Sequence, residues 1–88
     1  MGTKRIAIVT GGGTGLGKAM AHALIEDGFT VVLAGRRQNI LDAAADELGP
    51  NALALAADVT VPQSVTMLFD SVVERYGRVD LLVNNAGV

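Results

Sequence analysis

The feature of this sequence that most constrains its fold is a regular alternation of short apolar runs with longer amphipathic segments. The apolar runs are RIAIVT, TVVLA, ALALAA and DLLVNN, at residues 5–10, 30–34, 52–57 and 80–85. Such runs, apolar on both faces, are typical of strands buried in a parallel sheet. Between them, apolar residues recur every three or four positions, which is the spacing of one helix face. This alternation predicts an α/β fold with the order βαβαβαβ, in which parallel strands are joined by right-handed crossovers.

Three helices are expected between these strands, and their ends carry recognisable signals. Gly28, Gly49 and Gly77 follow the three segments, where glycine suits the left-handed conformation after a helix end. Thr60-Val61-Pro62-Gln63 predicts a capping box at the start of the third helix, where an early proline costs little. The apolar positions expected to pack in the core are Leu16, Ala19, Met20, Ala23 and Leu24 in the first helix, Leu41, Ala44, Ala45 and Leu48 in the second, and Val65, Met67, Leu68, Phe69, Val72, Val73 and Tyr76 in the third.

Composition restricts the class of protein. The 88 residues, half of them apolar and 18% charged, predict one small globular domain over residues 1–88. A net charge of −2 gives no reason to expect a nucleic acid or an anionic membrane as a partner. The absence of cysteine excludes disulfides and thiolate metal sites, and the first apolar run is too short for a signal peptide or a membrane span. We therefore expect a cytoplasmic protein without a metal site.

The loop after the first strand, GGGTGLGKA at residues 11–19, contains five glycines. Such a loop lets phosphate groups approach the backbone, either the pyrophosphate of a dinucleotide or the terminal phosphates of a nucleoside triphosphate. The triphosphate pattern is G-x-x-x-x-G-K followed by Ser or Thr, and Gly12, Gly17 and Lys18 match it. Ala19 then lacks the hydroxyl that binds Mg²⁺, which disfavours a P-loop nucleotide hydrolase.

The pattern that does fit this loop is T-G-x-x-x-G-x-G, through Thr10, Gly11, Gly15 and Gly17. Two further motifs follow in order, and they are Asp58-Val59 after the third strand and Asn84-Asn85-Ala86-Gly87 after the fourth. Together these residues resemble the short-chain dehydrogenase/reductase family, and the resemblance extends through the whole chain. It implies a Rossmann-like doubly wound parallel sheet with strand order 3-2-1-4, truncated to its first mononucleotide half. It also implies an NAD(P)-dependent oxidoreductase.

The glycines of this pattern have separate physical roles. Gly11 permits a tight turn off the strand, and Gly15 leaves room for the pyrophosphate beside the backbone. Gly17 allows the helix to pack close to the sheet. Backbone amides near Leu16 and Gly17 then face the phosphates at the positive end of the helix dipole. A structural alternative is that the glycines only make a tight turn between strand and helix.

The residues after the second strand indicate which dinucleotide binds. An acid that would bind the ribose hydroxyls is expected there, but the sequence has Arg36 and Arg37. A planar guanidinium suits the 2′-phosphate of NADP, so NADP is predicted and NAD is the alternative. Arg36 directly follows the strand and is the first candidate, Arg37 the second, and Thr14 is a candidate hydroxyl donor. Arg37 is equally well explained as a surface-loop residue.

The resemblance assigns roles to the other two motifs. It implies that the Asp58 carboxylate accepts a hydrogen bond from the adenine amino group, while the Val59 amide meets a ring nitrogen. The structural alternative is that Asp58 caps the third helix or bonds to local amides. The resemblance also implies that Asn85, Ala86 and Gly87 lie beside the cofactor ribose. Asn84 in the same stretch is as readily a polar group that stabilises the sheet.

Catalysis in this family is implied to need a Tyr and a Lys four residues apart, with a Ser and an Asn nearby. The only tyrosine here is Tyr76, which has Asp80 four residues on and lies on an apolar helix face. We therefore expect these 88 residues to bind a cofactor without turning over an alcohol or carbonyl substrate. A non-catalytic Rossmann-like nucleotide-binding or self-associating module is the alternative function. In the implied strand order the fourth strand is an open apolar edge, which predicts a homo-oligomer.

Overall fold

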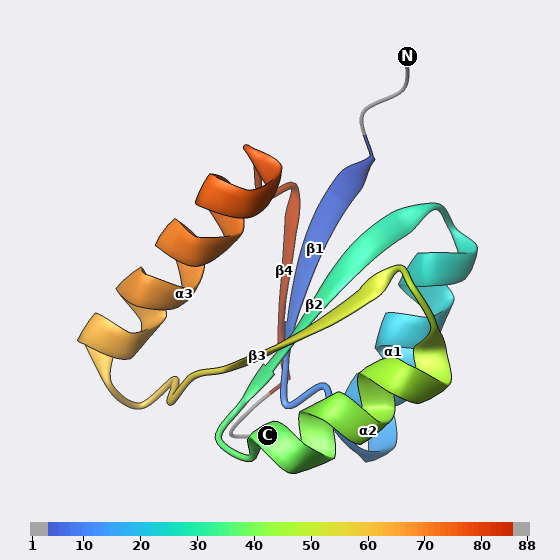
Figure 1. Ribbon diagram of the computed structural model, residues 1–88, viewed down its shortest axis with the longest axis horizontal. Coiled ribbons are helices and arrows are strands. Elements are labelled where there is room, and N and C mark those ends of the chain that lie inside the picture. The colour runs from blue at the N-terminus through green and yellow to red at the C-terminus, as the bar shows by residue number, and fades with distance from the viewer. Residues whose placement is uncertain (1–3, 86–88) are drawn as a thin grey trace.

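The computed structural model describes residues 4–85, which form a four-stranded parallel sheet with helices on both faces (Figure 1). The strands lie in the order β3-β2-β1-β4, and every neighbouring pair is parallel. The predicted α/β class, the βαβαβαβ order and the strand order 3-2-1-4 are confirmed. The elements are β1 (Arg5–Thr10), α1 (Gly15–Glu26), β2 (Phe29–Gly35), α2 (Gln38–Leu48), β3 (Ala52–Ala56), α3 (Pro62–Tyr76) and β4 (Leu81–Asn84).

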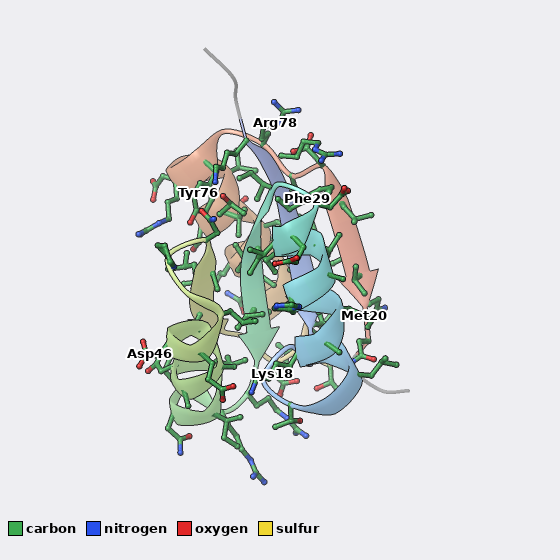
Figure 2. The ribbon with its side chains drawn as sticks, turned by 90° about the vertical axis from the view of Figure 1, so that its right-hand side faces the viewer. Lys18, Met20, Phe29, Asp46, Tyr76 and Arg78 are labelled. Atoms are coloured by element: carbon green, nitrogen blue, oxygen red, sulfur yellow. The ribbon has the colours of Figure 1, made fainter. Side chains whose placement is uncertain are left out.

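Side chains alternate across the sheet and divide the core into two layers. Val9 and Leu33 belong to the layer beneath α1 and α2, which lie side by side on one face (Figure 2). Ile8 and Val32 belong to the layer on the opposite face, where α3 packs. All four of these side chains are fully buried. The two central strands are apolar at most positions because both of their faces are covered.

The predicted apolar face of α1 is only partly correct: Leu24 packs against the core and Met20 is half-buried, but the other three positions are exposed. Leu16 is 65% exposed, and Ala19 and Ala23 also face solvent. The buried residues of the helix are Gly17 and Ala21. The helix approaches the sheet through these small residues, so its larger side chains near the N-terminus turn outward. In α2 the predicted face is correct, because its four apolar positions are buried or half-buried.

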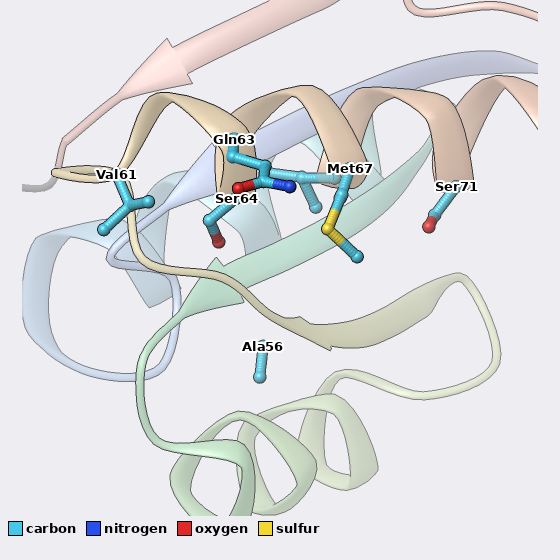
Figure 3. Close-up of a pocket in the computed structure, with 7 residues that line it drawn as sticks. Ala56, Val61, Gln63, Ser64, Met67 and Ser71 are labelled. Atoms are coloured by element: carbon cyan, nitrogen blue, oxygen red, sulfur yellow. The ribbon is translucent and has the colours of Figure 1, made fainter.

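The face of α3 that reaches the core is narrower than predicted. Leu68 and Val72, four residues apart, are buried, and Tyr76 packs beside them as expected. Met67 is 63% exposed and Val73 is 49% exposed, so their predicted core positions are wrong. Each is one residue, or about 100° of helix rotation, away from the buried row. The Met67 side chain instead borders a pocket between α3 and β3 (Figure 3).

The capping box predicted at the start of α3 does not form. Val61 occupies the N-cap position, where no side chain caps the helix, and Pro62 is the first helical residue. The Thr60 hydroxyl donates to Oδ1 of Asp58 at 2.6 Å. Thr60 is therefore engaged by a carboxylate that the capping-box pattern does not contain. The predicted helix ends are confirmed, since Gly28, Gly49 and Gly77 all have positive φ. Among residues 4–85, no helix combines the length and the apolar character that crossing a bilayer requires.

Asp80 connects the start of β4 to β1. Its carboxylate accepts hydrogen bonds from the Ile6 amide at 2.7 Å and from the Arg78 guanidinium at 2.6 and 3.0 Å. These bonds, that from Arg78 first, lower the pKa of Asp80 from its ordinary value of 3.8. Because the folded-state pKa is depressed, the stabilisation is present above the unfolded-state pKa and is lost as pH falls through the folded-state pKa.

We therefore expect Asp80→Asn to lower the urea midpoint of unfolding at pH 7. The difference from the wild type should shrink as the pH is taken below about 4, because protonation removes the same interaction. Asp46→Asn is the matched control, since the Asp46 side chain is exposed on α2 and makes no hydrogen bond or ion pair within residues 4–85. A difference that persists unchanged into acid would show that the charge of Asp80 contributes nothing.

Candidate functional site

The carboxyl ends of β1, β2 and β3 meet at the lower edge of the sheet in Figure 1, where their loops border two adjoining cavities. Ligands of open α/β sheets bind at this edge. A cavity of about 290 Å³ has Arg36, Asp58, Val59 and Thr60 in its wall. A cavity of about 400 Å³ has Gly13, Thr14, Arg36, Arg37 and Ile40 in its wall. Gly11, Gly35 and Arg36 border both, so the two cavities adjoin, and together they are called the recess.

Gly11 and Gly15 both adopt a backbone conformation that favours glycine. Their φ angles are 67° and 54°, in the left-handed region that side chains other than glycine rarely enter. The Gly11 amide donates to the Ala34 carbonyl at 2.8 Å, which holds the turn off β1 against the end of β2. A Cβ on Gly15 would meet no atom within 4 Å, so the outer side of this residue is open.

Gly17 is required by a close backbone contact. A Cβ placed there would lie 2.1 Å from the Gly11 carbonyl oxygen and 2.8 Å from Nδ2 of Asn85. The predicted close approach of helix and sheet therefore includes a backbone contact directly after the end of β1. It sets the position of the first turn of α1 relative to the glycine loop.

Two further glycines have roles that the sequence motif does not contain. A Cβ on Gly12 would lie 2.8 Å from Cδ2 of Leu33, and one on Gly13 would lie 2.8 Å from Cγ2 of Ile40. These positions keep the loop pressed against β2 and the start of α2. The signal in the sequence was the number of glycines, which exceeds the three that the fingerprint explains.

The N-terminus of α1 is open toward this loop. Thr14 is its N-cap residue but makes no side-chain capping bond, and the Lys18 amide makes a 3.4 Å bond to the Thr14 carbonyl. Within residues 4–85, the amides of Gly15, Leu16 and Gly17 donate no hydrogen bond. Unpaired amides at the positive end of a helix form a site for an anion.

The two arginines after β2 occupy different positions. Both side chains are exposed, and neither forms an ion pair within the described part of the chain. Arg36 borders both cavities, whereas Arg37 borders only the larger one and is the N-cap residue of α2. Thr14 lies in the wall of the larger cavity with them. The structure thus brings Thr14, Arg36 and Arg37 together in the wall of the larger cavity, and of the three only Arg36 also borders the smaller one.

Asp58 is held by its neighbour Thr60. Oδ1 of Asp58 accepts from the Thr60 hydroxyl at 2.6 Å and from the Thr60 amide at 2.9 Å. These bonds, with a smaller contribution from the Arg36 charge, keep the pKa of the Asp58 carboxyl below its ordinary value. The Val59 amide donates no hydrogen bond within residues 4–85. Asp58 does not cap α3, but it does bond to a local amide as the structural alternative expected.

The asparagines after β4 join this strand to β1. The Thr10 hydroxyl donates to Oδ1 of Asn84 at 3.2 Å and accepts from the Asn85 amide at 2.9 Å. The Asn85 side chain also donates to the Gly11 carbonyl at 3.4 Å. The predicted sheet-stabilising role of Asn84 is thereby supported. The predicted site residues Ala86 and Gly87 lie outside the described residues.

Lys18, which would be the phosphate-binding lysine of a P-loop, is engaged elsewhere. Its Nζ lies 2.6 Å from Oε2 of Glu47, so that it links α1 to α2 across their exposed sides (Figure 2). Ala19 beside it is exposed and has no hydroxyl to offer a metal ion. The arrangement favours a dinucleotide over a nucleoside triphosphate at this loop.

The model of the short chain dehydrogenase family matches residues 5–88. The chain belongs to this family. It is 36% identical over 84 residues to an uncharacterized oxidoreductase of Staphylococcus epidermidis, covering 96% of this chain and 36% of that protein. It is 38% identical over 84 residues to the 3-oxoacyl-(acyl-carrier-protein) reductase FabG of Vibrio cholerae, covering 96% of this chain and 34% of that protein. The predicted resemblance is confirmed.

Solved structures of the family superpose on this fold. Actinorhodin polyketide ketoreductase with NADPH has a TM-score of 0.91 and 38% identity, over 97% of this chain and 34% of that one. The 3-ketoacyl-(acyl-carrier-protein) reductase of Brucella melitensis, complexed with NADH, has a TM-score of 0.84 and 32% identity, over 92% of this chain and 34% of that one. The chain therefore spans about a third of the length of these relatives.

Proposed function

We propose that the recess at the carboxyl edge of the sheet binds NADP(H), and that the chain is the cofactor-binding part of an oxidoreductase. In the full-length protein, hydride passes between the nicotinamide and an alcohol or carbonyl substrate. The observation that carries this proposal is the position of Arg36, which borders both cavities beside the glycine loop. An open helix N-terminus, a guanidinium and a carboxylate around one recess match the parts of an adenine dinucleotide.

The pyrophosphate is assigned to the first turn of α1. The amides of Gly15, Leu16 and Gly17 have no acceptor within residues 4–85, and Gly11 and Gly15 leave the backbone accessible. Each favourable interaction with the helix terminus contributes about 0.3–1 kcal/mol at an exposed site. Lys18, the charged side chain of this loop, is paired with Glu47, so the backbone is the proposed binding group.

The 2′-phosphate is assigned to Arg36, with Thr14 and Arg37 beside it in the larger cavity. The relatives do not decide between the cofactors, because one of the similar structures holds NADPH and another holds NADH. The choice of NADP rests on chemistry. An arginine bonds to a phosphate with charge assistance, whereas a carboxylate at this place would bond to the ribose hydroxyls of NAD.

The remaining predicted residues are assigned to the adenosine and nicotinamide ends. The Asp58 carboxylate and the Val59 amide border the smaller cavity and are proposed to bond to the edge of the adenine ring. Asn85, tied to the Gly11 carbonyl, is proposed to lie beside the ribose with Ala86 and Gly87. A chain without cysteine suits a reducing compartment, and the cytoplasm is the location we propose.

The cofactor proposal is tested by titrating the 88-residue chain with NADPH and following the fluorescence of the nicotinamide. We expect saturable binding that is reversed by NADP and unaffected by MgATP. Absence of saturable binding would overturn the proposal. Displacement of NADPH by MgATP at comparable concentration would favour the P-loop alternative instead.

The same chain is expected to have no reductase activity. Its only tyrosine, Tyr76, packs against the core beneath α3 and has Asp80 four residues on, where the family's proton relay has a lysine. Oxidation of NADPH in the presence of a panel of ketones and aldehydes should therefore proceed at the uncatalysed rate. A rate that rises with protein concentration would contradict the expectation that these 88 residues are inactive.

A second candidate function, self-association, is favoured by the edge strand β4. Leu81 and Leu82 are 37% and 46% exposed, and within residues 4–85 the strand pairs with β1 on one side only. An apolar open edge is a template for pairing with another strand. We expect sedimentation equilibrium to give a homo-oligomer that Leu82→Lys shifts toward the monomer. A wild-type chain that sediments as a monomer over a wide concentration range would rule this out.

A further inference from the structure

We propose that Thr60 and Ser64 are positioning residues for adenine recognition, which orient Asp58 and Val59 from opposite ends of the loop between β3 and α3. This inference rests on the proposed function. Neither residue belongs to the motifs that led to the site. The proposal does not require either of them to contact the cofactor. Their part is to decide which atoms of the loop face the smaller cavity.

Thr60 fixes the carboxylate of Asp58. Both of its hydrogen bonds, from the hydroxyl at 2.6 Å and from the amide at 2.9 Å, go to the same oxygen, Oδ1. Oδ2 accepts no hydrogen bond within residues 4–85. A carboxylate that is bonded through one oxygen cannot rotate freely, and its second oxygen remains available to an external donor. Thr60 and Asp58 both border the smaller cavity.

Ser64 fixes the backbone of the same loop. Its hydroxyl accepts from the Asp58 amide at 2.8 Å, and it lies on the first turn of α3 on the side facing the loop (Figure 3). The Asp58 carbonyl accepts from the Val61 amide at 3.0 Å. Asp58 is therefore anchored to α3 through its amide and to the N-cap residue before this helix through its carbonyl. Val59, which follows it, is left with an amide that donates to no acceptor in the described chain.

Together these bonds leave one hydrogen-bond acceptor, Oδ2 of Asp58, beside one donor, the amide of Val59. A free carboxylate oxygen next to a free amide matches the adenine edge, which offers an amino group and a ring nitrogen acceptor. In the same orientation, the hypoxanthine ring presents a carbonyl oxygen in place of that amino group and an N–H in place of the neighbouring nitrogen acceptor. A carboxylate oxygen facing this carbonyl gains no bond and is repelled by it. The geometry therefore predicts discrimination against hypoxanthine, and the discrimination depends on how firmly Asp58 is held.

The test compares the affinity of the 88-residue chain for NADP with its affinity for the hypoxanthine analogue of NADP. We expect the wild type to prefer NADP by about tenfold or more, the size of one charged hydrogen bond. Thr60→Val, which keeps the shape and the amide but removes the hydroxyl, should lower this ratio by at least about threefold. Thr60→Ser should restore it. Ser64→Ala should weaken binding of NADP and lower the same ratio.

Thr66→Val is the matched control, because among residues 4–85 the Thr66 hydroxyl bonds only to the Pro62 carbonyl, within α3. It should leave both affinities unchanged. The ratio of NADP to NAD affinity should also stay constant in every variant, since it reports on the ribose end of the site. A folded Thr60→Val variant with the wild-type preference for adenine would overturn this inference and leave the proposed function standing. Failure of the wild type to bind either dinucleotide would overturn both.

Discussion

Replacing Gly17 by alanine is expected to lower the free energy of unfolding by about 3 kcal/mol, the upper end of the range for overpacked sites. The new Cβ would lie 2.1 Å from the Gly11 carbonyl oxygen, which belongs to the backbone and cannot swing aside. The first turn of α1 must then move outward, which separates Ala21 from the core and displaces the amides proposed to bind the pyrophosphate. Because these amides move, the Gly17→Ala variant should also bind NADPH more weakly than the wild type.

Gly35→Ala is the matched control for this change. Gly35 does not have a positive φ, and a Cβ there would lie 3.5 Å from the nearest atom of Leu41, which is ordinary contact. Urea unfolding at neutral pH should place Gly35→Ala within about 0.5 kcal/mol of the wild type. If Gly17→Ala were equally stable, the close contact between α1 and the end of β1 would be wrong.

Arg36→Asp is expected to lower the affinity for NADPH by about 100-fold and to reverse the preference toward NADH. Charge-assisted hydrogen bonds contribute about 1.5–3 kcal/mol, and the new carboxylate also repels the 2′-phosphate. With NADH the same carboxylate accepts from the ribose hydroxyls, so that affinity should be retained or rise. Fluorescence titration of the wild type and the variant with both cofactors measures the change directly.

Arg37→Ala provides the comparison for Arg36. Arg37 borders only the larger cavity and takes the N-cap position of α2, so its removal should weaken NADPH binding by less than about fivefold. The assignment is wrong if the wild-type chain binds NADH as tightly as NADPH. It is also wrong if Arg37→Ala proves more damaging than Arg36→Ala.

The fold was predictable because hydrophobic pattern and turn residues agree along the chain. β1 has the predicted bounds, and the other strands differ from their predictions by no more than one residue at either end. The failures are local. Periodicity placed Leu16 in the core, but the close contact at Gly17 turns this side chain outward. Such a contact depends on a carbonyl from another part of the chain, which a local pattern does not contain.

The candidate site was predictable only in part, for a related reason. The glycine motif, the two arginines and Asp58 follow strand ends, and the ends of parallel strands must meet. Thr60 was misjudged as a helix cap because the spacing of residue types does not reveal whether its hydroxyl accepts from a helix amide or donates to a nearby carboxylate. Its bond to Asp58 instead of α3 is a property of the loop geometry.

The most direct test of the central claim is to map where 2′,5′-ADP binds, using amide chemical shifts of the isotopically labelled chain. This probe carries the adenosine and the 2′-phosphate that the recess is proposed to hold. We predict shifts that concentrate at Gly11, Arg36 and Val59 and that saturate with the ligand. Shifts confined to the pocket between α3 and β3, around Met67 and Ser71, or no saturable shift at all, would contradict the account.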